Sequence, residues 1–439
     1  MQNMKYNHLL SDRKRLDGRT FYWRVLLVFC VSLAMFVVSS CTSKTGRTVH
    51  PDVDPRISLF ADDHHDLTAS GPTLRDHLIN RKASLLQLQN LPAGELKPLV
   101  LEARTTAEQR AGIRRIRIRG FQIESDSGPD FAGYNIGPSS PESAQAVLAS
   151  DIADTYLNYA ALRGIPLDSL EVTIGSGRSQ QPDTTSTGRV WYPRNLIYTA
   201  YIVSPATDEE LEALRKEVEE KSPLFNLVSK AQVVTGDIDY TQTPKELAIP
   251  AGYQPGLREY LKYKRNAYLH IQERSKAAAA NPSENPSPSE PRITAHIKVE
   301  GATGVRRIHI REFEILHDNP AYLAGNDLGP SAQEHQLGVL TSCITHITLI
   351  QAAAREIPLD TLAVSVKGTI DYRAGRPGFE DVPRFPHNIS YTVHVKSPVP
   401  YEKIVELRDA VEAVCPIYNL LKDEQVIIGK IERGRYRRE

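Results

Sequence analysis

The alternation of apolar and polar residues predicts most of the elements of this 439-residue chain. A long helix is predicted to begin at Ser331. From Leu337 to Ala354, apolar side chains fall on nearly every side of it, which is typical of a helix buried at the centre of a domain. Alternating segments predict strands at 293–299, 305–316, 362–370 and 388–395. A charged amphipathic helix at 401–414 and a last strand near 425–431 complete the pattern. This order of elements predicts an α+β fold, with a sheet wrapped on two helices.

The same pattern occurs twice in the chain. The sequence RIRIRGF at 115–121 matches RIHIREF at 307–313, and the sequence IPLD at 165–168 recurs at 357–360, both at a spacing of 192 residues. A period of this length indicates duplicated domains rather than a solenoid. We therefore expect one domain at 72–240 and a second at 255–434.

Each repeat also carries the sequence Gly-Pro-Ser at the start of its long helix. Ser139 and Ser331 are each followed three residues later by a glutamate, which is the signature of a capping box. Within the second repeat, Ala277–Pro291 is rich in Pro and Ser and is expected to be a flexible loop.

The first 40 residues have the organisation of a bacterial lipoprotein signal peptide. Basic residues precede an apolar run from Val25 to Val38, which is too short to span a bilayer comfortably. The run ends in Val-Ser-Ser-Cys, a lipobox-like sequence in which Cys41 would take the lipid. We expect a lipid-anchored protein of the cell envelope, on the periplasmic face of the outer membrane in a Gram-negative cell, with residues 41–71 as a tether. The alternative is a short uncleaved anchor with an incidental cysteine.

Composition excludes several classes of protein. The chain has 53 basic and 53 acidic residues, so no basic surface for nucleic acid is expected. It has no apolar run of about 20 residues that a polytopic membrane protein would need. Four cysteines in this length do not form a disulfide scaffold. Cleavage would remove Cys30 and commit Cys41 to the lipid, which leaves two thiols, Cys343 and Cys415.

These two thiols suit a redox pair. Cys343 lies in the buried helix, whereas Cys415 precedes Pro416 and therefore leaves the helical conformation. The alternative is that both are small buried hydrophobes. In the first repeat the matching positions are Asp151 and Ser222, which cannot reduce a peroxide, so this repeat would keep the fold and serve as a scaffold.

Several motifs together resemble the OsmC/Ohr family of osmotically inducible and organic-hydroperoxide-resistance proteins. They are GPSxxE at 329–334, LTSC at 340–343, IPLDxL at 357–362 and AVCP at 413–416. The resemblance implies a thiol-dependent peroxidase that needs no cofactor and reduces organic hydroperoxides, with Cys343 as the peroxidatic thiol and Cys415 as the resolving thiol. It also implies intertwined dimers with the active sites at the dimer interface. We therefore expect the two repeats to pair as an intramolecular pseudo-dimer in a monomeric chain.

The resemblance further implies an arginine, held by a carboxylate, that activates the thiol. Glu334 matches the glutamate of the family motif, although a capping-box role explains it equally well. Arg311 is the nearest arginine upstream of Cys343 in its repeat, and Arg119 is its equivalent in the other repeat. His346 shares a helix face with Cys343 and is interpreted as a packed or hydrogen-bonded core residue, with thiol tuning as the alternative. No further Cys or His cluster supports a metal site.

Other functions remain open on the sequence alone. One is a non-catalytic protein that holds a small lipophile between the repeats, and another is a redox sensor whose disulfide changes a surface. The reductant is expected to be a dithiol that an exported protein can reach. Asp151 would be costly to bury alone, and we expect Arg117, Arg119 or a water-filled space to satisfy it.

Overall fold

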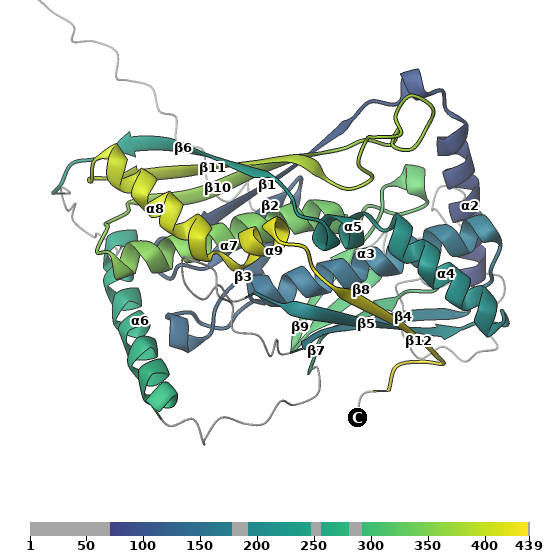
Figure 1. Ribbon diagram of the computed structural model, residues 1–439, viewed down its shortest axis with the longest axis horizontal. Coiled ribbons are helices and arrows are strands. Elements are labelled where there is room, and N and C mark those ends of the chain that lie inside the picture. Colours follow the sequence, from purple (N-terminus) through teal and green to yellow (C-terminus); the bar gives the residue numbers. More distant parts are fainter. Residues whose placement is uncertain (1–70, 178–191, 247–255, 281–291, 438–439) are drawn as a thin grey trace, which may run out of the picture. The chain divides into compact units, whose positions relative to one another are not determined.

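The computed structural model describes residues 71–177, 192–246, 256–280 and 292–437 (Figure 1). The predicted signal peptide and the predicted tether up to residue 70 lie outside these residues. The same is true of 281–291, which is most of the segment expected to be a flexible loop. Ala277 to Ala280 of that segment continue a helix, so the loop begins later than the sequence predicted.

Both halves of the chain contain the same elements in the same order. The first half comprises α2 (Leu74–Asn90), β1 (Leu99–Ala107), β2 (Arg114–Ile118), β3 (Phe121–Ser125), α3 (Ser140–Arg163), β4 (Ser169–Gly177), β5 (Arg194–Val203), α4 (Asp208–Lys221), α5 (Pro223–Ser229) and β6 (Val234–Gln242). The second half comprises α6 (Leu257–Ala280), β7 (Arg292–Val299), β8 (Arg306–Ile310), β9 (Phe313–His317), α7 (Ala332–Ala354), β10 (Thr361–Ile370), β11 (His387–Ser397), α8 (Tyr401–Val414), α9 (Pro416–Lys422) and β12 (Ile427–Arg433).

The strands form two six-stranded sheets, and each sheet combines strands of both halves. The order is β3-β2-β1-β10-β11-β6 in the first sheet, here called sheet A, and β12-β5-β4-β7-β8-β9 in the second, sheet B. Antiparallel pairs β1–β10 and β4–β7 join the halves, and so do the parallel pairs β6–β11 and β5–β12. The ranges 72–240 and 255–434 therefore repeat an order of elements, but neither range has a sheet of its own.

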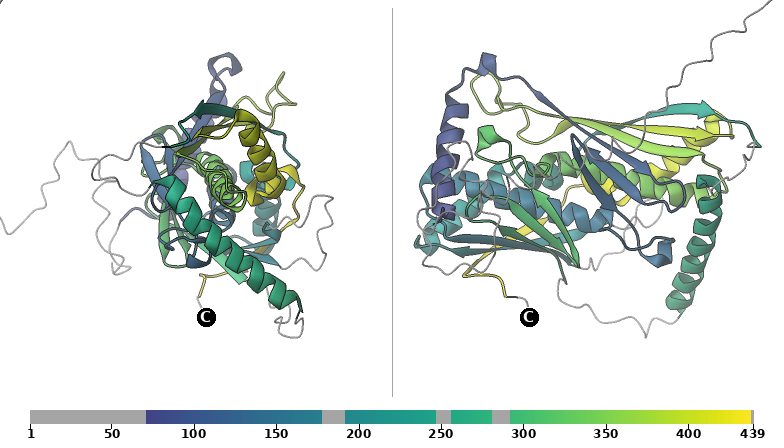
Figure 2. Two further views of the ribbon diagram at one scale, coloured as in Figure 1. Left: turned by 90° about the vertical axis from the view of Figure 1, so that its left-hand side faces the viewer. Right: turned by 180° about the vertical axis from the view of Figure 1, so that it is seen from behind.

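The two long helices α3 and α7 contact each other between the sheets (Figure 1). Helix α7 packs on β1, β2 and β10, and helix α3 packs on β4, β7 and β8. In the left view of Figure 2, α7 lies inside a ring of strands and helices. Its length and composition would suit a membrane-spanning helix, but most of its surface is buried within the fold, as expected for a core helix.

Capping fixes where these helices begin. Ser139 and Ser331 are the N-caps of α3 and α7, and both capping boxes predicted from the sequence are present. The short helices α5 and α9, which the sequence pattern did not reveal, begin at Pro223 and Pro416, the first helical position where proline is well tolerated.

The predicted strand at 305–316 is in fact a hairpin of two strands. Ile310 pairs with Phe313, so Arg311 and Glu312 form a two-residue turn between β8 and β9. Arg311 adopts a left-handed conformation with φ of 52°, and Arg119 does the same at the matching turn of the first half. Apolar residues alternate on both sides of the turn, at Ile308 and Ile310 and again at Phe313 and Ile315, but the alternation changes phase at Glu312. The predicted single strand overlooked this change of phase.

Candidate thiol site

The structure brings Cys343 and Cys415 into contact. Cys343 lies in α7, and Cys415 lies at the junction of α8 and α9, where it is the C-cap of one helix and the N-cap of the other. Their Sγ atoms are 3.4 Å apart, and both residues are free, buried thiols with exposed fractions of 2% and 0%. A modest movement of either side chain would permit a disulfide.

The surroundings of Cys415 favour its neutral form. Burial raises the pKa of the Cys415 thiol well above its usual value, and the neighbouring sulfur of Cys343 raises it further. The backbone N–H groups of Ile417 and Tyr418 act in the opposite direction, but their effect on the pKa is smaller. Cys415 is therefore suited to act as a thiol that responds to chemistry at Cys343.

A buried arginine from the other half of the chain, Arg114 on β2, interacts with Cys343. Its Nε donates to Ser342 Oγ at 3.2 Å, and its terminal nitrogens lie 3.1 Å from Ser125 Oγ and 3.3 Å from Ser127 Oγ. Burial lowers the pKa of Arg114 to about 10, and attraction to Asp126 and to the thiolate of Cys343 opposes this. The guanidinium therefore stays protonated at neutral pH, with its positive charge near the sulfur of Cys343.

His346, which lies on the same helix as Cys343, forms a hydrogen bond with Arg114. Its Nδ1 lies 3.2 Å from Arg114 Nη1 and 3.3 Å from Ser127 Oγ. Because a guanidinium can only donate, Nδ1 accepts and the imidazole is neutral with its proton on Nε2. Burial and the charges of Arg114 and Lys264 lower the pKa of His346 well below its usual value, which is consistent with this state. His346 is thus a hydrogen-bonded residue that orients Arg114.

Lys264 adds a second basic group near Arg114. It lies on α6, and its Nζ donates to the carbonyl of Phe131 at 2.7 Å. Burial, together with the charge of Arg114, lowers the pKa of Lys264 to about 7. Asp126 attracts both cations, and its own carboxylate accepts the backbone N–H of Tyr134 at 2.8 Å.

Glu334 and Arg311 lie elsewhere. Glu334 precedes Cys343 by nine residues on α7, which places it about 14 Å away along the helix axis. It caps the helix and forms an ion pair of 2.7 Å with Arg119. Arg311 forms the matching ion pair of 2.8 Å with Glu142. Each pair ties a hairpin of one half to a long helix of the other half, and the structure does not bring Glu334 or Arg311 to the thiols.

In the first half, Asp151 and Ser222 occupy the positions of the two cysteines and are also in contact. Asp151 Oδ2 accepts from Ser222 Oγ at 2.6 Å and from the backbone N–H of Leu224 at 2.8 Å, and Oδ1 accepts from Gln333 Nε2 at 2.5 Å. The expectation that Arg117 or Arg119 would satisfy this carboxylate is therefore wrong, because neutral donors on α5 and α7 do so. Burial raises the pKa of Asp151 to about 7.

Arg306 on β8 of the second half, which is the counterpart of Arg114, is paired with a carboxylate. Arg306 donates to Asp154 Oδ1 at 2.8 Å, and Arg81 donates to the same oxygen at 2.6 Å. In the part of the chain that the structure describes, Arg114 has no hydrogen bond or ion pair to a carboxylate. The two equivalent positions therefore differ in the partners of the arginine as well as in the thiols. Arg306 pairs with a carboxylate, whereas Arg114 contacts neutral side chains near Cys343.

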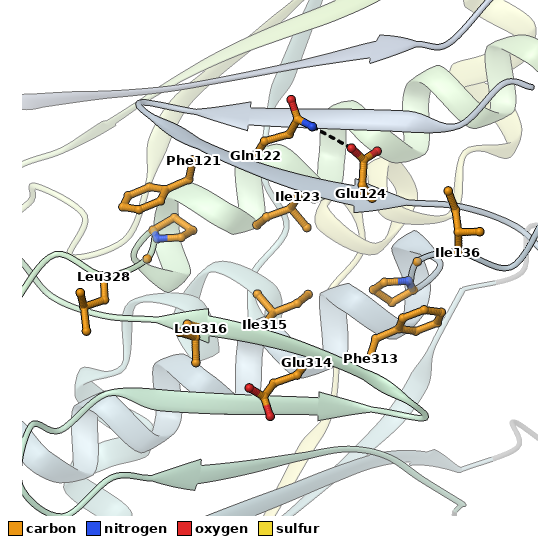
Figure 3. A pocket seen from close by; sticks show the side chains of 14 residues that line it. Phe121, Gln122, Ile123, Glu124, Ile136, Phe313, Glu314, Ile315, Leu316 and Leu328 are labelled. Atoms are coloured by element: carbon orange, nitrogen blue, oxygen red, sulfur yellow. Dashed lines mark hydrogen bonds between the residues drawn. The ribbon is translucent and has the colours of Figure 1, made fainter. Parts of the chain in front are cut away.

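A pocket lies next to this site but does not contain the thiols. It has a volume of about 330 Å³ and lies between the edge strands β3 and β9, one from each half (Figure 3). Its lining is mixed: the polar residues Gln122, Glu124 and Glu314 accompany the apolar residues Phe121, Ile123, Ile136, Pro138, Phe313, Ile315, Leu316, Leu328 and Pro330. Ser125 Oγ donates to the carbonyl of Pro138 and accepts from Arg114, so one serine separates the pocket wall from the arginine.

Sequence reasoning missed Arg114, although the pattern contained a signal for it. Arg114 alternates with Ile116 and Ile118, so its side chain shares their inward face, whereas Arg115 and Arg117 point outward. Proximity along the sequence favoured Arg311, with Arg119 as its equivalent in the other repeat, and gave no reason to choose Arg114. The exchange of strands between the halves is what brings an arginine of the first repeat to this thiol.

A match to a family model supports part of this picture. Residues 325–428 match the family model described as OsmC-like protein. The structure is similar to the crystal structure of an OsmC like protein from Mycoplasma pneumoniae, with 20% identity, a TM-score of 0.23, and coverage of 30% of this chain and 84% of that one. No curated protein matches the sequence. Within the described residues, no group of three or more His, Cys, Asp or Glu residues could hold a metal ion.

Proposed function

We propose that the chain is a thiol-dependent peroxidase that reduces organic hydroperoxides at Cys343. The observation that carries the proposal is the contact of Cys343 with Cys415, at 3.4 Å, beside the buried cation Arg114. The match of residues 325–428 to an OsmC-like family model supports a peroxidase or stress-related role.

The chemistry follows from these three residues. The Cys343 thiolate, stabilised by Arg114, attacks the distal oxygen of the hydroperoxide, the O–O bond breaks, and the alkoxide leaves with a proton as the alcohol. Cys343 becomes a sulfenic acid. Cys415 then condenses with it, water leaves, and a disulfide forms. An external dithiol returns both residues to thiols by exchange.

Access to the thiol requires some movement, since Cys343 is almost fully buried. Around Arg114, His346 is partly exposed and Phe131 is 39% exposed, and the two rings are in edge contact with centroids 6.0 Å apart. We infer that the substrate approaches along this side, where displacement of Phe131 would expose the guanidinium and the thiol. An apolar hydroperoxide suits an approach past an aromatic ring.

The two halves would stand for the two subunits of an intertwined dimer. The exchange of strands between the sheets and the contact of α3 with α7 support this interpretation. Only one of the two equivalent sites has thiols, because Asp151 and Ser222 replace them in the other. The first half would then contribute Arg114 and half of the scaffold to a single active site.

The location at the cell envelope rests on the sequence of residues 1–41. Acylation of Cys41 would hold the peroxidase at a membrane, where lipid hydroperoxides form. Incorporation of radiolabelled palmitate into the wild-type chain, and its loss in Cys41→Ala, would support this part. A wild-type chain that takes up no label would contradict it.

Turnover of an organic hydroperoxide tests the proposed reaction. Purified protein with a dithiol reductant should consume cumene hydroperoxide, and Cys343→Ser should abolish consumption. A wild-type protein that consumes no more hydroperoxide than Cys343→Ser would contradict the proposal. Because Cys343 is replaced by a group of similar size, loss of activity would not be due to a cavity.

The pocket of Figure 3 supports a second candidate function, the binding of a small lipophile. Ile123 and Ile315 face each other across its centre, one from each half. Displacement of a fluorescent fatty acid would report binding, and Ile315→Glu should abolish it. Binding that survives this substitution would place the lipophile elsewhere.

A further inference from the structure

A Ser–His–Asp arrangement lies on the outer face of sheet A, formed by three adjacent strands. Ser365 on β10 has its Oγ 2.7 Å from His394 Nε2 on β11. His394 Nδ1 lies 2.8 Å from Asp239 Oδ2 on β6. The His394 side chain is 26% exposed and that of Asp239 is 66% exposed, so solvent reaches this group.

The atoms define the direction of the hydrogen bonds. A carboxylate can only accept, so the hydrogen of a neutral His394 is on Nδ1 and is donated to Asp239. Nε2 is then an acceptor, and the Ser365 hydroxyl donates to it. This is the order of a nucleophile, a general base and the carboxylate that orients the base.

Two arginines extend the site across the same face. Arg104 on β1 is the cross-strand partner of Ser365, and Arg117 on β2 is the cross-strand partner of Arg104. Like charges directly opposite each other destabilise a sheet. An anion bound between the two arginines would relieve this repulsion. Neither arginine forms an ion pair with any residue in the described ranges. An anionic group bound there would lie beside the Ser365 hydroxyl.

The corresponding face of sheet B provides an internal comparison. The register places Thr173, Tyr201 and Glu432 at the positions of Ser365, His394 and Asp239. Tyr201 is hydrogen-bonded to Thr173, and burial raises its pKa, so it cannot serve as a base at neutral pH. At the positions of Arg104 and Arg117 are His296 and His309, which face Glu171 and Glu314 at 2.6 Å and 3.6 Å.

We propose that the outer face of sheet A is a second reactive site, at which Ser365 is an activated nucleophile towards carboxylic esters that carry an anionic group. His394 is the general base, Asp239 orients it, and Arg104 with Arg117 binds the anionic part of the ester. The site is distinct from Cys343 and does not depend on the proposed peroxidase.

The reaction at this site is an acyl transfer. Ser365 Oγ bonds to the carbonyl carbon while its proton passes to His394 Nε2. The bond to the leaving alcohol breaks, and the alcohol takes that proton. Water then attacks the acyl-serine, gives a proton to Nε2, and releases the acid as the proton returns to Ser365 Oγ.

A fluorophosphonate probe tests the nucleophile directly. The full chain is labelled in a Cys343→Ser background, so that the thiol does not react, and the labelled peptide is identified by mass spectrometry. We expect the label on Ser365, and a decrease of about 100-fold in the labelling rate in His394→Gln, in the range that a general base contributes. Thr173→Ala, at the matching position of sheet B, should label as the parent does.

Ester hydrolysis tests the role of the arginines. Arg104→Gln should slow hydrolysis of the anionic ester mono-4-nitrophenyl glutarate by about tenfold and change that of neutral 4-nitrophenyl acetate by less than twofold. Equal slowing of the two esters would overturn anion recognition. No label on Ser365 in the parent chain, or equal labelling of Ser365 in His394→Gln, would overturn the whole proposal.

Discussion

Arg114 Nε donates to Ser342 Oγ at 3.2 Å, which links a strand of the first half to the residue next to Cys343 in the second half. The cation near the thiol pair thus comes from the first repeat, whose described residues include no cysteine. Arg306, its counterpart, is bound by Asp154 instead. The two arginines therefore occupy equivalent strand positions but have different partners.

Substitution of Arg114 should reduce the reactivity of Cys343. Arg114→Lys keeps a charge but loses the donors to Ser342 and Ser125, so the cation is no longer held beside the sulfur. A rise of one unit in the thiol pKa lowers the thiolate fraction about tenfold. We expect at least this decrease in the second-order rate with cumene hydroperoxide, measured by stopped flow, and a shift of the pH–rate profile to higher pH.

Arg306→Lys is the matched control for this substitution. It is equally buried and occupies the equivalent strand position, but it contacts Asp154 rather than a thiol. Arg306→Lys should lower the free energy of unfolding but should not shift the pH–rate profile of Cys343. Equal effects of the two substitutions on the profile would contradict the assignment of Arg114.

The sequence predicted the helices well because their signals are local. The capping boxes at Ser139 and Ser331 and the apolar residues around α7 depend on neighbours within a few positions. The contact of Cys343 with Cys415 agrees with a pairing that the family resemblance implied. Alternating residues also identified most strands, though not the turn at Arg311.

Strand partners could not be predicted in this way. The pattern of β1 shows which face is apolar but not that its neighbour is β10, more than 250 residues later in the sequence. The same limitation hid Arg114, whose place beside Cys343 depends on that pairing and on β2. The position of Asp151 was predicted, but its partners on α5 and α7 again depend on packing between the halves.

Asp151 should make stability depend on pH. Its pKa is raised from 3.8 to about 7, so the folded state keeps a proton that the unfolded state loses between these values. The free energy of unfolding should therefore fall as pH rises through this window and level off above pH 7. In Asp151→Asn, the free energy of unfolding should fall over this pH window by roughly 2–4 kcal/mol less than in the wild type.

Urea unfolding at pH 5 and pH 8 measures this effect. Asp151→Asn should gain stability relative to the wild type at pH 8 more than at pH 5. Asp208→Asn, at a position whose side chain is 83% exposed, should behave as the wild type at both values. An Asp151→Asn gain that is independent of pH would show that Asp151 is ionised in the folded protein.

The first half should accept a second thiol pair. Because Ser222 Oγ lies 2.6 Å from Asp151 Oδ2, the double substitution Asp151→Cys and Ser222→Cys should place two sulfurs in contact. Diamide should then form a disulfide there, detected by peptide mass spectrometry. Arg306 remains bound to Asp154, so this pair should react with cumene hydroperoxide at least about tenfold more slowly than Cys343. An equal rate would show that Arg114 does not accelerate the reaction of Cys343.

Pairing of the halves within one chain should make the protein monomeric. Both halves contribute strands to each sheet, so a second chain is not needed to cover α3 and α7. Light scattering in detergent, with the mass of the detergent subtracted, should give the mass of one chain. A dimer that persists on dilution would contradict the proposed intramolecular pairing.

The most direct test of the proposed peroxidase is the product of a single turnover. The reduced protein is mixed with one equivalent of cumene hydroperoxide, and its peptides are analysed by mass spectrometry. We predict one equivalent of alcohol and a disulfide between Cys343 and Cys415, whereas Cys415→Ser should stop at a sulfenic or sulfinic acid on Cys343. Unmodified thiols in the wild type, or oxidation of Cys415 when Cys343 is replaced by serine, would contradict the account.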